Sequence, residues 1–101
     1  MAVRTKQDAA RVLDDTSEDK RFFCHDGCVS RNLNELAECL DHITDDSYRH
    51  HVTSAKNDFS NWVRDVLGDD KLANDLSLCA NGADAVKAVR GRVAWLQKKL
   101  K

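Results

Sequence analysis

The apolar residues between positions 50 and 73 recur at the spacing of an α-helix. Successive apolar positions lie one, three or four residues apart, which gathers them on one side of a helix. They are Ala55, Phe59, Trp62, Val63, Val66 and Leu67. We expect Thr53 or Ser54 to cap the start of this helix, and Gly68 to end it in the left-handed conformation. Its two aromatic residues should anchor a buried core.

Two polar residues interrupt this pattern near its start. Asn57 and Asp58 precede Phe59, although neither is a favoured residue inside a helix. Two interpretations remain open. They bind the backbone of a neighbouring loop and fix the start of the helix, which we favour, or they form an exposed polar patch with Asn61.

A second, shorter helix follows Gly68. Asp69 or Asp70 can cap its first turn, and this explains the pair better than a role as catalytic acid and base. Its apolar face carries Leu72, Ala73 and Leu76. The two helices should therefore meet at a tight corner.

The Asp-Gly pair at positions 26–27 lies between two short apolar segments. This pattern is typical of a β-hairpin with a two-residue type I′ turn. In that register Cys24 faces Val29 and His25 faces Cys28. Cys24 and Cys28 would then project from opposite faces of the hairpin.

Three further helices are predicted from caps and apolar stripes. Asn32 opens the first, with Glu35 as the reciprocal partner of a capping box. Thr44 or Asp45 opens a short second helix, and Asn81 opens the last. The apolar faces carry Leu33, Leu36, Leu40 and Ile43 in the first, Tyr48, His51 and Val52 in the second, and Val86, Val89, Val93, Leu96 and Leu100 in the third.

These elements predict a mainly α fold, a small bundle of four or five helices with a short β-hairpin near the N-terminus. Residues 1–19 should form a polar N-terminal segment with a weak, loosely docked helix. Residues 20–101 should form a single compact helical domain. A chain of 101 residues supports one modest core and no deep substrate cleft.

The order HHV, KNDF, NWVRDV, GD and LA within residues 50–73 resembles a small domain family of unknown function that occurs in archaea and some bacteria. The similarity covers residues 20–79 and includes Phe22, Phe23, Asp26, Gly27, Leu33 and Leu36. It implies no activity, cofactor or partner, and the cysteines lie outside its pattern. The structural core of the motif consists of Phe59, Trp62, Val63, Val66, Gly68, Leu72 and His51.

Charge is distributed unevenly along the chain. The formal net charge is −1, yet residues 85–101 contain six basic residues and no acidic one. The candidate interaction surface on the last helix comprises Lys87, Arg90, Arg92, Trp95, Lys98, Lys99 and Lys101. It could bind phosphates and stack an aromatic ring on a base, or it could be a solvated basic face whose tryptophan widens the core. The net charge near zero argues against a dedicated nucleic-acid binder.

The cysteine and histidine residues invite a test for metal. Cys24, His25 and Cys28 could be zinc ligands with His50 or His51, but the predicted hairpin register separates the two thiols. The two neighbouring histidines also diverge on a helix, His50 pointing away from the core. We therefore expect no metal and no cofactor. His51 is interpreted as a core histidine that donates a ring N–H to a carbonyl or carboxylate.

No apolar run approaches the roughly 18 residues that span a bilayer, and the first ten residues do not form a secretion signal. We expect no membrane association, a cytosolic location, and reduced thiols at Cys24, Cys28, Cys39 and Cys79. No residue is placed as an activated nucleophile, so an enzyme is not expected. The function predicted is a small interaction module that binds an unknown protein or itself, with a homodimer through the seam of the last helix as one option. The alternative is a nucleic-acid-associated protein that uses the basic C-terminal helix.

Overall fold

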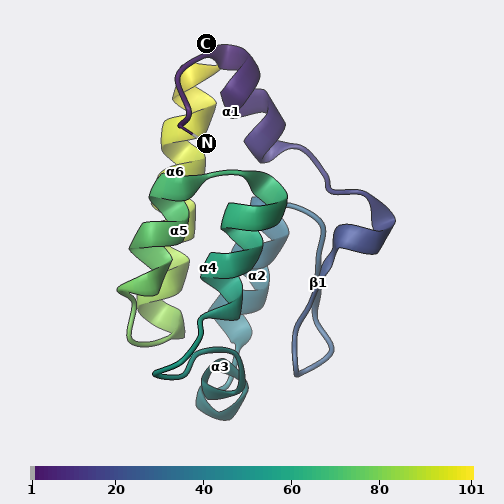
Figure 1. The fold of residues 1–101 in the computed structure, drawn as a ribbon, viewed down its shortest axis with the longest axis vertical. Helices are drawn as coiled ribbons and strands as arrows, with labels where there is room; N and C mark the ends of the chain where they lie inside the picture. The colour runs from purple at the N-terminus through teal and green to yellow at the C-terminus, as the bar shows by residue number, and fades with distance from the viewer. Residues whose placement is uncertain (1) are drawn as a thin grey trace.

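The computed structural model describes residues 2–101, which form six α-helices and one β-hairpin (Figure 1). In chain order the elements are α1 (Lys6–Leu13), the 3₁₀ turn η1 (Glu18–Lys20), β1 (Phe22–Phe23), β2 (Val29–Ser30), α2 (Leu33–His42), α3 (Asp45–His51), α4 (Asp58–Trp62), the π-helical turn η2 (Val63–Leu67), α5 (Asp70–Ser77) and α6 (Gly82–Lys99). The predicted class is confirmed: the fold is mainly α with a hairpin near the N-terminus. The described chain has six α-helices where four or five were expected.

The long helix α6 organises the packing. It contacts α1, α2 and α5, while α4 packs on α5 and the hairpin packs on α2 through β2. Figure 1 shows α5 and α6 as an antiparallel pair joined by a short loop, with α1 lying across the C-terminal end of α6. One side of α6 is thus covered by other helices, and the other side faces solvent.

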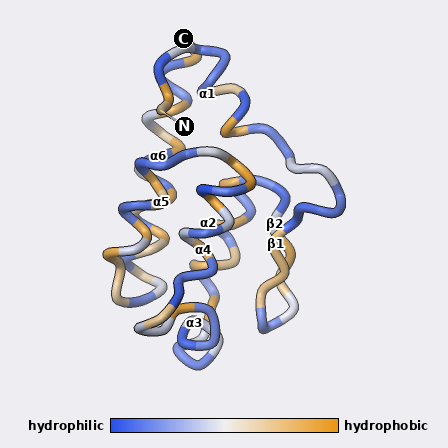
Figure 2. Tube along the Cα trace, viewed as in Figure 1, coloured by the Kyte–Doolittle hydropathy of each residue, from blue (hydrophilic) through white to orange (hydrophobic). Residues whose placement is uncertain are grey.

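The predicted apolar stripes meet in one core. Its largest fully buried side chains include Phe59, Leu33, Leu36, Leu72, Leu76 and Leu96. Hydrophobic and hydrophilic stretches alternate along the helices, and the hairpin has two hydrophobic arms with a hydrophilic tip (Figure 2). Trp62 is 8% exposed and donates its indole N–H to the carbonyl of Lys20 at 2.8 Å, so its only polar atom is satisfied.

The apolar seam of α6 is used inside the chain. Val89 and Leu96 are fully buried, Val86 and Val93 are 7% exposed, and only Leu100 reaches 40%. A homodimer through this seam, which the sequence suggested as an option, would require the core to open. The homodimer stays a prediction, and it would need contacts other than the buried part of this seam.

The N-terminal helix α1 is docked firmly. Thr5 and Asp8 form a capping box, and Ala9 and Val12 are fully buried. Burial of these two side chains against the bundle makes α1 part of the core, whereas the sequence suggested a loosely docked helix.

The long helix of the sequence motif begins later than expected. Asn57, not Thr53 or Ser54, is its cap: the side-chain oxygen accepts from the Ser60 N–H at 3.0 Å. The Asn57 amide also donates to the Leu76 carbonyl at 3.0 Å, as the favoured interpretation of this residue required. Ala55 is exposed and lies outside the helix.

The second half of this helix widens into the π-helical turn η2. The Gly68 N–H donates to the Val63 carbonyl at 2.9 Å, five residues back. Gly68 has a φ of 79°, which confirms the predicted left-handed end. The extra residue in the turn rotates the positions that follow, so Leu67 is buried and Val66 only partly buried.

The hairpin register differs by one residue from the prediction. Phe23 pairs with Val29, and the Cys24 N–H donates to the Cys28 carbonyl at 2.8 Å, so Cys24 faces Cys28. The turn uses a positive φ at Gly27 alone (96°) instead of at both central residues. Because Asp26 does not have a positive φ, the turn is not the two-residue type I′ turn that was predicted, and the loop is longer.

The two hairpin cysteines therefore lie on the same face, and the argument that separated them is wrong. Cys28 forms a disulfide with Cys39 of α2, while Cys24 and Cys79 are free. The expectation that all the thiols are reduced is also wrong for the bonded pair. Among the described residues, no helix is both long enough and apolar enough to cross a membrane.

Candidate functional site

The predicted basic surface of α6 divides into engaged and free cations. Arg92 has only 11% of its side chain exposed and binds Asp69 through two hydrogen bonds of 2.7 and 3.0 Å. Arg90 lies 3.5 Å from Asp41 of α2. The charge of Arg92 is thus engaged by Asp69, and Arg92 is not among the cations that are free to bind an anionic partner.

Lys87, Lys98 and Lys101 are exposed and, within residues 2–101, their side-chain ammonium groups make no ion pair or hydrogen bond. Lys87 and Lys98 lie on α6, eleven residues apart and therefore on the same side of the helix, and Lys101 follows just beyond its C-terminal end. These three lysines are the cations that remain available to an anionic partner.

A groove lies between α5 and α6 next to this side. Its volume is about 460 Å³, and it is lined by Lys71, Asp75, Lys87, Ala88, Gly91, Arg92 and Trp95. We call its two small lining residues, Ala88 and Gly91, the floor, and Trp95 also lines the groove. The acidic residue in the groove, Asp75, is bound by Lys71 at 2.6 Å. We call this feature the α5–α6 groove.

Trp95 is the exposed aromatic side chain of the groove, with 42% of its surface accessible. The Arg92 guanidinium carbon lies 4.2 Å from the ring centroid, and the Lys99 ammonium lies 5.1 Å from it. These cation–π contacts hold the ring in place. Because a cation already occupies a ring face, Trp95 is poorly suited to stack on a base, as a nucleic-acid site would require.

Gly91 has no packing reason inside the chain. A Cβ atom built at this position would meet no other atom within 4 Å. Glycine inside a helix costs roughly 0.5–1 kcal/mol relative to alanine. The missing side chain at Gly91 leaves open space beside Trp95, at this cost in helix stability.

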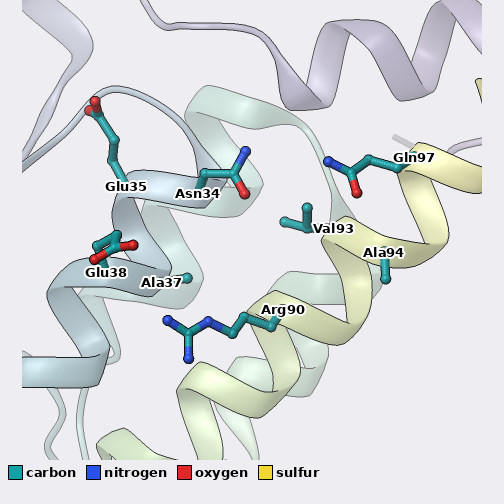
Figure 3. A pocket seen from close by; sticks show the side chains of 8 residues that line it. All are labelled: Asn34, Glu35, Ala37, Glu38, Arg90, Val93, Ala94 and Gln97. Carbon is teal, nitrogen blue, oxygen red and sulfur yellow. The ribbon is translucent and has the colours of Figure 1, made fainter.

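A second groove lies on the other side of α6, against α2. Figure 3 shows Arg90 and Gln97 of α6 opposite Asn34, Glu35 and Glu38 of α2. This groove is smaller, about 250 Å³, and its charged lining residues are two acids and one base, against one acid and three bases in the α5–α6 groove. It therefore lacks the basic character of the α5–α6 groove.

His51 sits in the core of the sequence motif, as predicted. Its side chain is 8% exposed, and Nδ1 lies 3.0 Å from Oδ2 of Asp58. Its Nε2 accepts the backbone N–H of His25 at 2.8 Å. Burial by itself would raise the pKa of Asp58, but hydrogen bonds from Lys56 and His51 outweigh it and hold the pKa below the usual value.

This pair resembles the base and orienting carboxylate of a catalytic triad, yet its chemistry is blocked. The Nε2 atom that would accept a proton from a nucleophile already accepts the His25 amide. Burial raises the pKa of the nearby Cys24 thiol, which keeps it in the poorly nucleophilic protonated form. Among residues 2–101, no three His, Cys, Asp or Glu side chains are grouped to hold a metal.

Comparison of the chain with protein-family models, with curated proteins and with solved structures found no match. We therefore infer the function from the groove and the charges around it.

Two features of the site were missed from the sequence. The first is the partner of Arg92, because Asp69 is 23 residues away and no local pattern joins them. The second is the role of Gly91, whose only signal was a glycine in the middle of a strong helical pattern.

Proposed function

We propose that the protein is a small non-enzymatic interaction module that binds an acidic segment of a protein partner in the α5–α6 groove. The observation that carries the proposal is Trp95, an exposed aromatic residue held in a fixed position beside an open glycine floor. Exposed, preorganised tryptophans with an adjacent pocket are typical anchors of protein interfaces.

Charge supports the acidic character of the partner. Of the free lysines, Lys87 lines the groove and would meet carboxylates there, while Lys98 and Lys101 lie further toward the C-terminus and would steer association. Nucleic acid is the weaker candidate, because the net charge is −1 and the ring of Trp95 already contacts two cations.

The proposed location is the cytosol. A disulfide is uncommon there. Cys39, however, is only 4% exposed, so a soluble reductant would reach the Cys28–Cys39 bond only through the half-buried Cys28.

Affinity capture from nuclease-treated cell extract tests the proposal. We expect wild-type protein to retain a partner that is lost with Trp95→Ala and with the triple charge reversal of Lys87, Lys98 and Lys101 to Glu. Reversal of an exposed lysine on α1, Lys6→Glu, is the matched control and should retain the partner. A partner retained by all variants, or one that disappears with nuclease treatment, would contradict the proposal.

A further inference from the structure

The tip of the hairpin is attached to α3 through two contacts of His25. Its backbone N–H donates to His51 Nε2 at 2.8 Å. Its ring stacks on His50, with centroids 4.0 Å apart and planes inclined by 20°. Three imidazoles therefore meet where the hairpin touches the helix.

The hydrogen bonds of His51 require a neutral ring. Nδ1 must carry the proton, because the Asp58 carboxylate that it contacts at 3.0 Å accepts. Nε2 must be bare, because the His25 amide can only donate. A second proton on the ring would place two N–H groups against each other, and the bond to the hairpin would be lost. The charged ring would still pair with Asp58, so α3 and α4 would stay joined.

The stacked pair adds a second dependence on protons. Two cationic rings in face-to-face contact repel each other, so the stack tolerates one charge at most. The pKa of His50 lies below its usual value. The larger cause is repulsion from His25, and the smaller one is desolvation of the His50 ring. A lowered histidine pKa means that the docked state resists protonation. Its stabilising effect is present above about pH 6.5 and is lost as the pH falls.

Other charges face this cluster from each neighbouring element. Asp26 lies in the hairpin turn, and its side chain accepts the Cys28 N–H at 3.2 Å. From the loop and α4, Lys56 and Asp58 bind each other at 2.9 Å and act on His50 with opposite signs. On α3, Arg49 lies 3.8 Å from Asp46. Lys56 pairs with Asp58 and Arg49 pairs with Asp46, so the contacts among the three imidazoles are the ones that an added proton would break.

We propose that His25, His50 and His51 form a pH-sensitive latch that docks the hairpin tip on α3 at neutral pH and releases it in mild acid. Release frees Nε2 of His51 and separates the stacked rings, so that each imidazole can take up a proton. The movement is confined to the tip, because the Cys28–Cys39 disulfide ties the hairpin to α2. The latch does not depend on the proposed partner.

Amide hydrogen exchange of the full-length, ¹⁵N-labelled protein between about pH 7.5 and pH 5 tests the latch. Each proton bound on release raises the ratio of released to docked molecules by about tenfold per pH unit below the titration. We expect the His25 amide to lose protection at least that steeply, relative to Val89 in the core of α6. An unchanged His25 protection factor would overturn the proposal. So would a parallel loss at Val89, which indicates global unfolding.

Two matched variants sharpen the test. His50→Gln removes one ring of the stack that can bind a proton. The loss of His25 protection should then be less steep, by about a factor of ten for each pH unit. His42→Gln changes an exposed histidine of α2, whose ring contacts the Glu38 carbonyl outside the cluster, and should behave as wild type. Equal responses of the two variants would also overturn the proposal.

Discussion

Asp69 and Arg92 form a buried ion pair that joins the start of α5 to the middle of α6. Asp69 is fully buried, accepts two hydrogen bonds from Arg92 and also caps α5 by accepting the Leu72 N–H at 3.2 Å. The pair fixes one wall of the α5–α6 groove and places the guanidinium beside Trp95. The groove is therefore built on a contact in the core.

Loss of Arg92 should be strongly destabilising. Arg92→Met leaves the Asp69 carboxylate buried without its cation, which typically costs about 3–5 kcal/mol in the free energy of unfolding. Chemical denaturation measures this difference. Adding Asp69→Asn should recover part of the loss, because the amide is neutral and its oxygen can still cap α5. Arg90→Met, which breaks an exposed pair, should change stability by no more than about 1 kcal/mol. Equal costs for the two arginines would contradict the assignment of Arg92 to the core.

Helix starts were predicted correctly from the sequence where the capping contact is local, and wrongly where a residue distant in sequence determines the position of the cap. The caps Asn32 and Asn81, and Thr44 as one of two candidates, were found because each accepts from a backbone N–H three residues later. The reciprocal bond expected from Glu35 is not formed, because its carboxylate accepts from the Arg31 N–H. The start of α4 was misplaced because the Asn57 side-chain amide also donates a hydrogen bond to the Leu76 carbonyl, 19 residues away.

The prediction of the hairpin register was wrong for a different reason. Both candidate turns suit an Asp-Gly pair, and the choice depends on whether aspartate adopts a positive φ. The disulfide between Cys28 and Cys39 then followed from the true register, which turns Cys28 toward α2. Of the candidate site, the exposed lysines and Trp95 were predictable from helical spacing, whereas the groove was not.

The same substitution at two glycines of α6 should have opposite effects. Gly91→Ala should stabilise the free protein by about 0.5–1 kcal/mol, because the new methyl group meets nothing and glycine disfavours a helix. Gly82→Ala should destabilise it by about 1–3 kcal/mol, since its Cβ would lie 2.8 Å from Ile43 Cγ2 and 3.3 Å from the Leu40 carbonyl. Thermal unfolding of both variants checks the pair. If Gly91→Ala also lowers the stability of the protein, Gly91 has a packing role, and the description of an open floor at Gly91 is wrong.

The two tryptophans should respond differently to truncation. Trp62→Ala should lower the free energy of unfolding by about 3–5 kcal/mol, because Trp62 is buried against Phe22. Trp95→Ala should cost no more than about 1 kcal/mol, chiefly its cation–π contacts. Similar losses for both would mean that Trp95 belongs to the core, and the groove would lose its anchor.

Nucleic acid offers a direct contrast to the proposed partner. We expect affinity for a generic oligonucleotide no tighter than about 10⁻⁴ to 10⁻⁶ M at physiological salt, the range of non-specific contacts. Fluorescence anisotropy across a salt series measures it. Sub-micromolar, salt-sensitive binding that is lost on charge reversal of Lys98, Lys99 and Lys101 would favour the nucleic-acid alternative.

Site-specific photo-crosslinking from the groove tests the central proposal most directly. A photoreactive residue at Lys87 lies on the groove, whereas one at Glu18 of η1 lies across the molecule from α5 (Figure 1). In nuclease-treated cell extract, the account predicts a crosslink from position 87, and none from position 18, to one protein, mapped by mass spectrometry to an acidic segment. A crosslink from position 87 to a neutral or basic segment, or equal yields from the two positions, would contradict it.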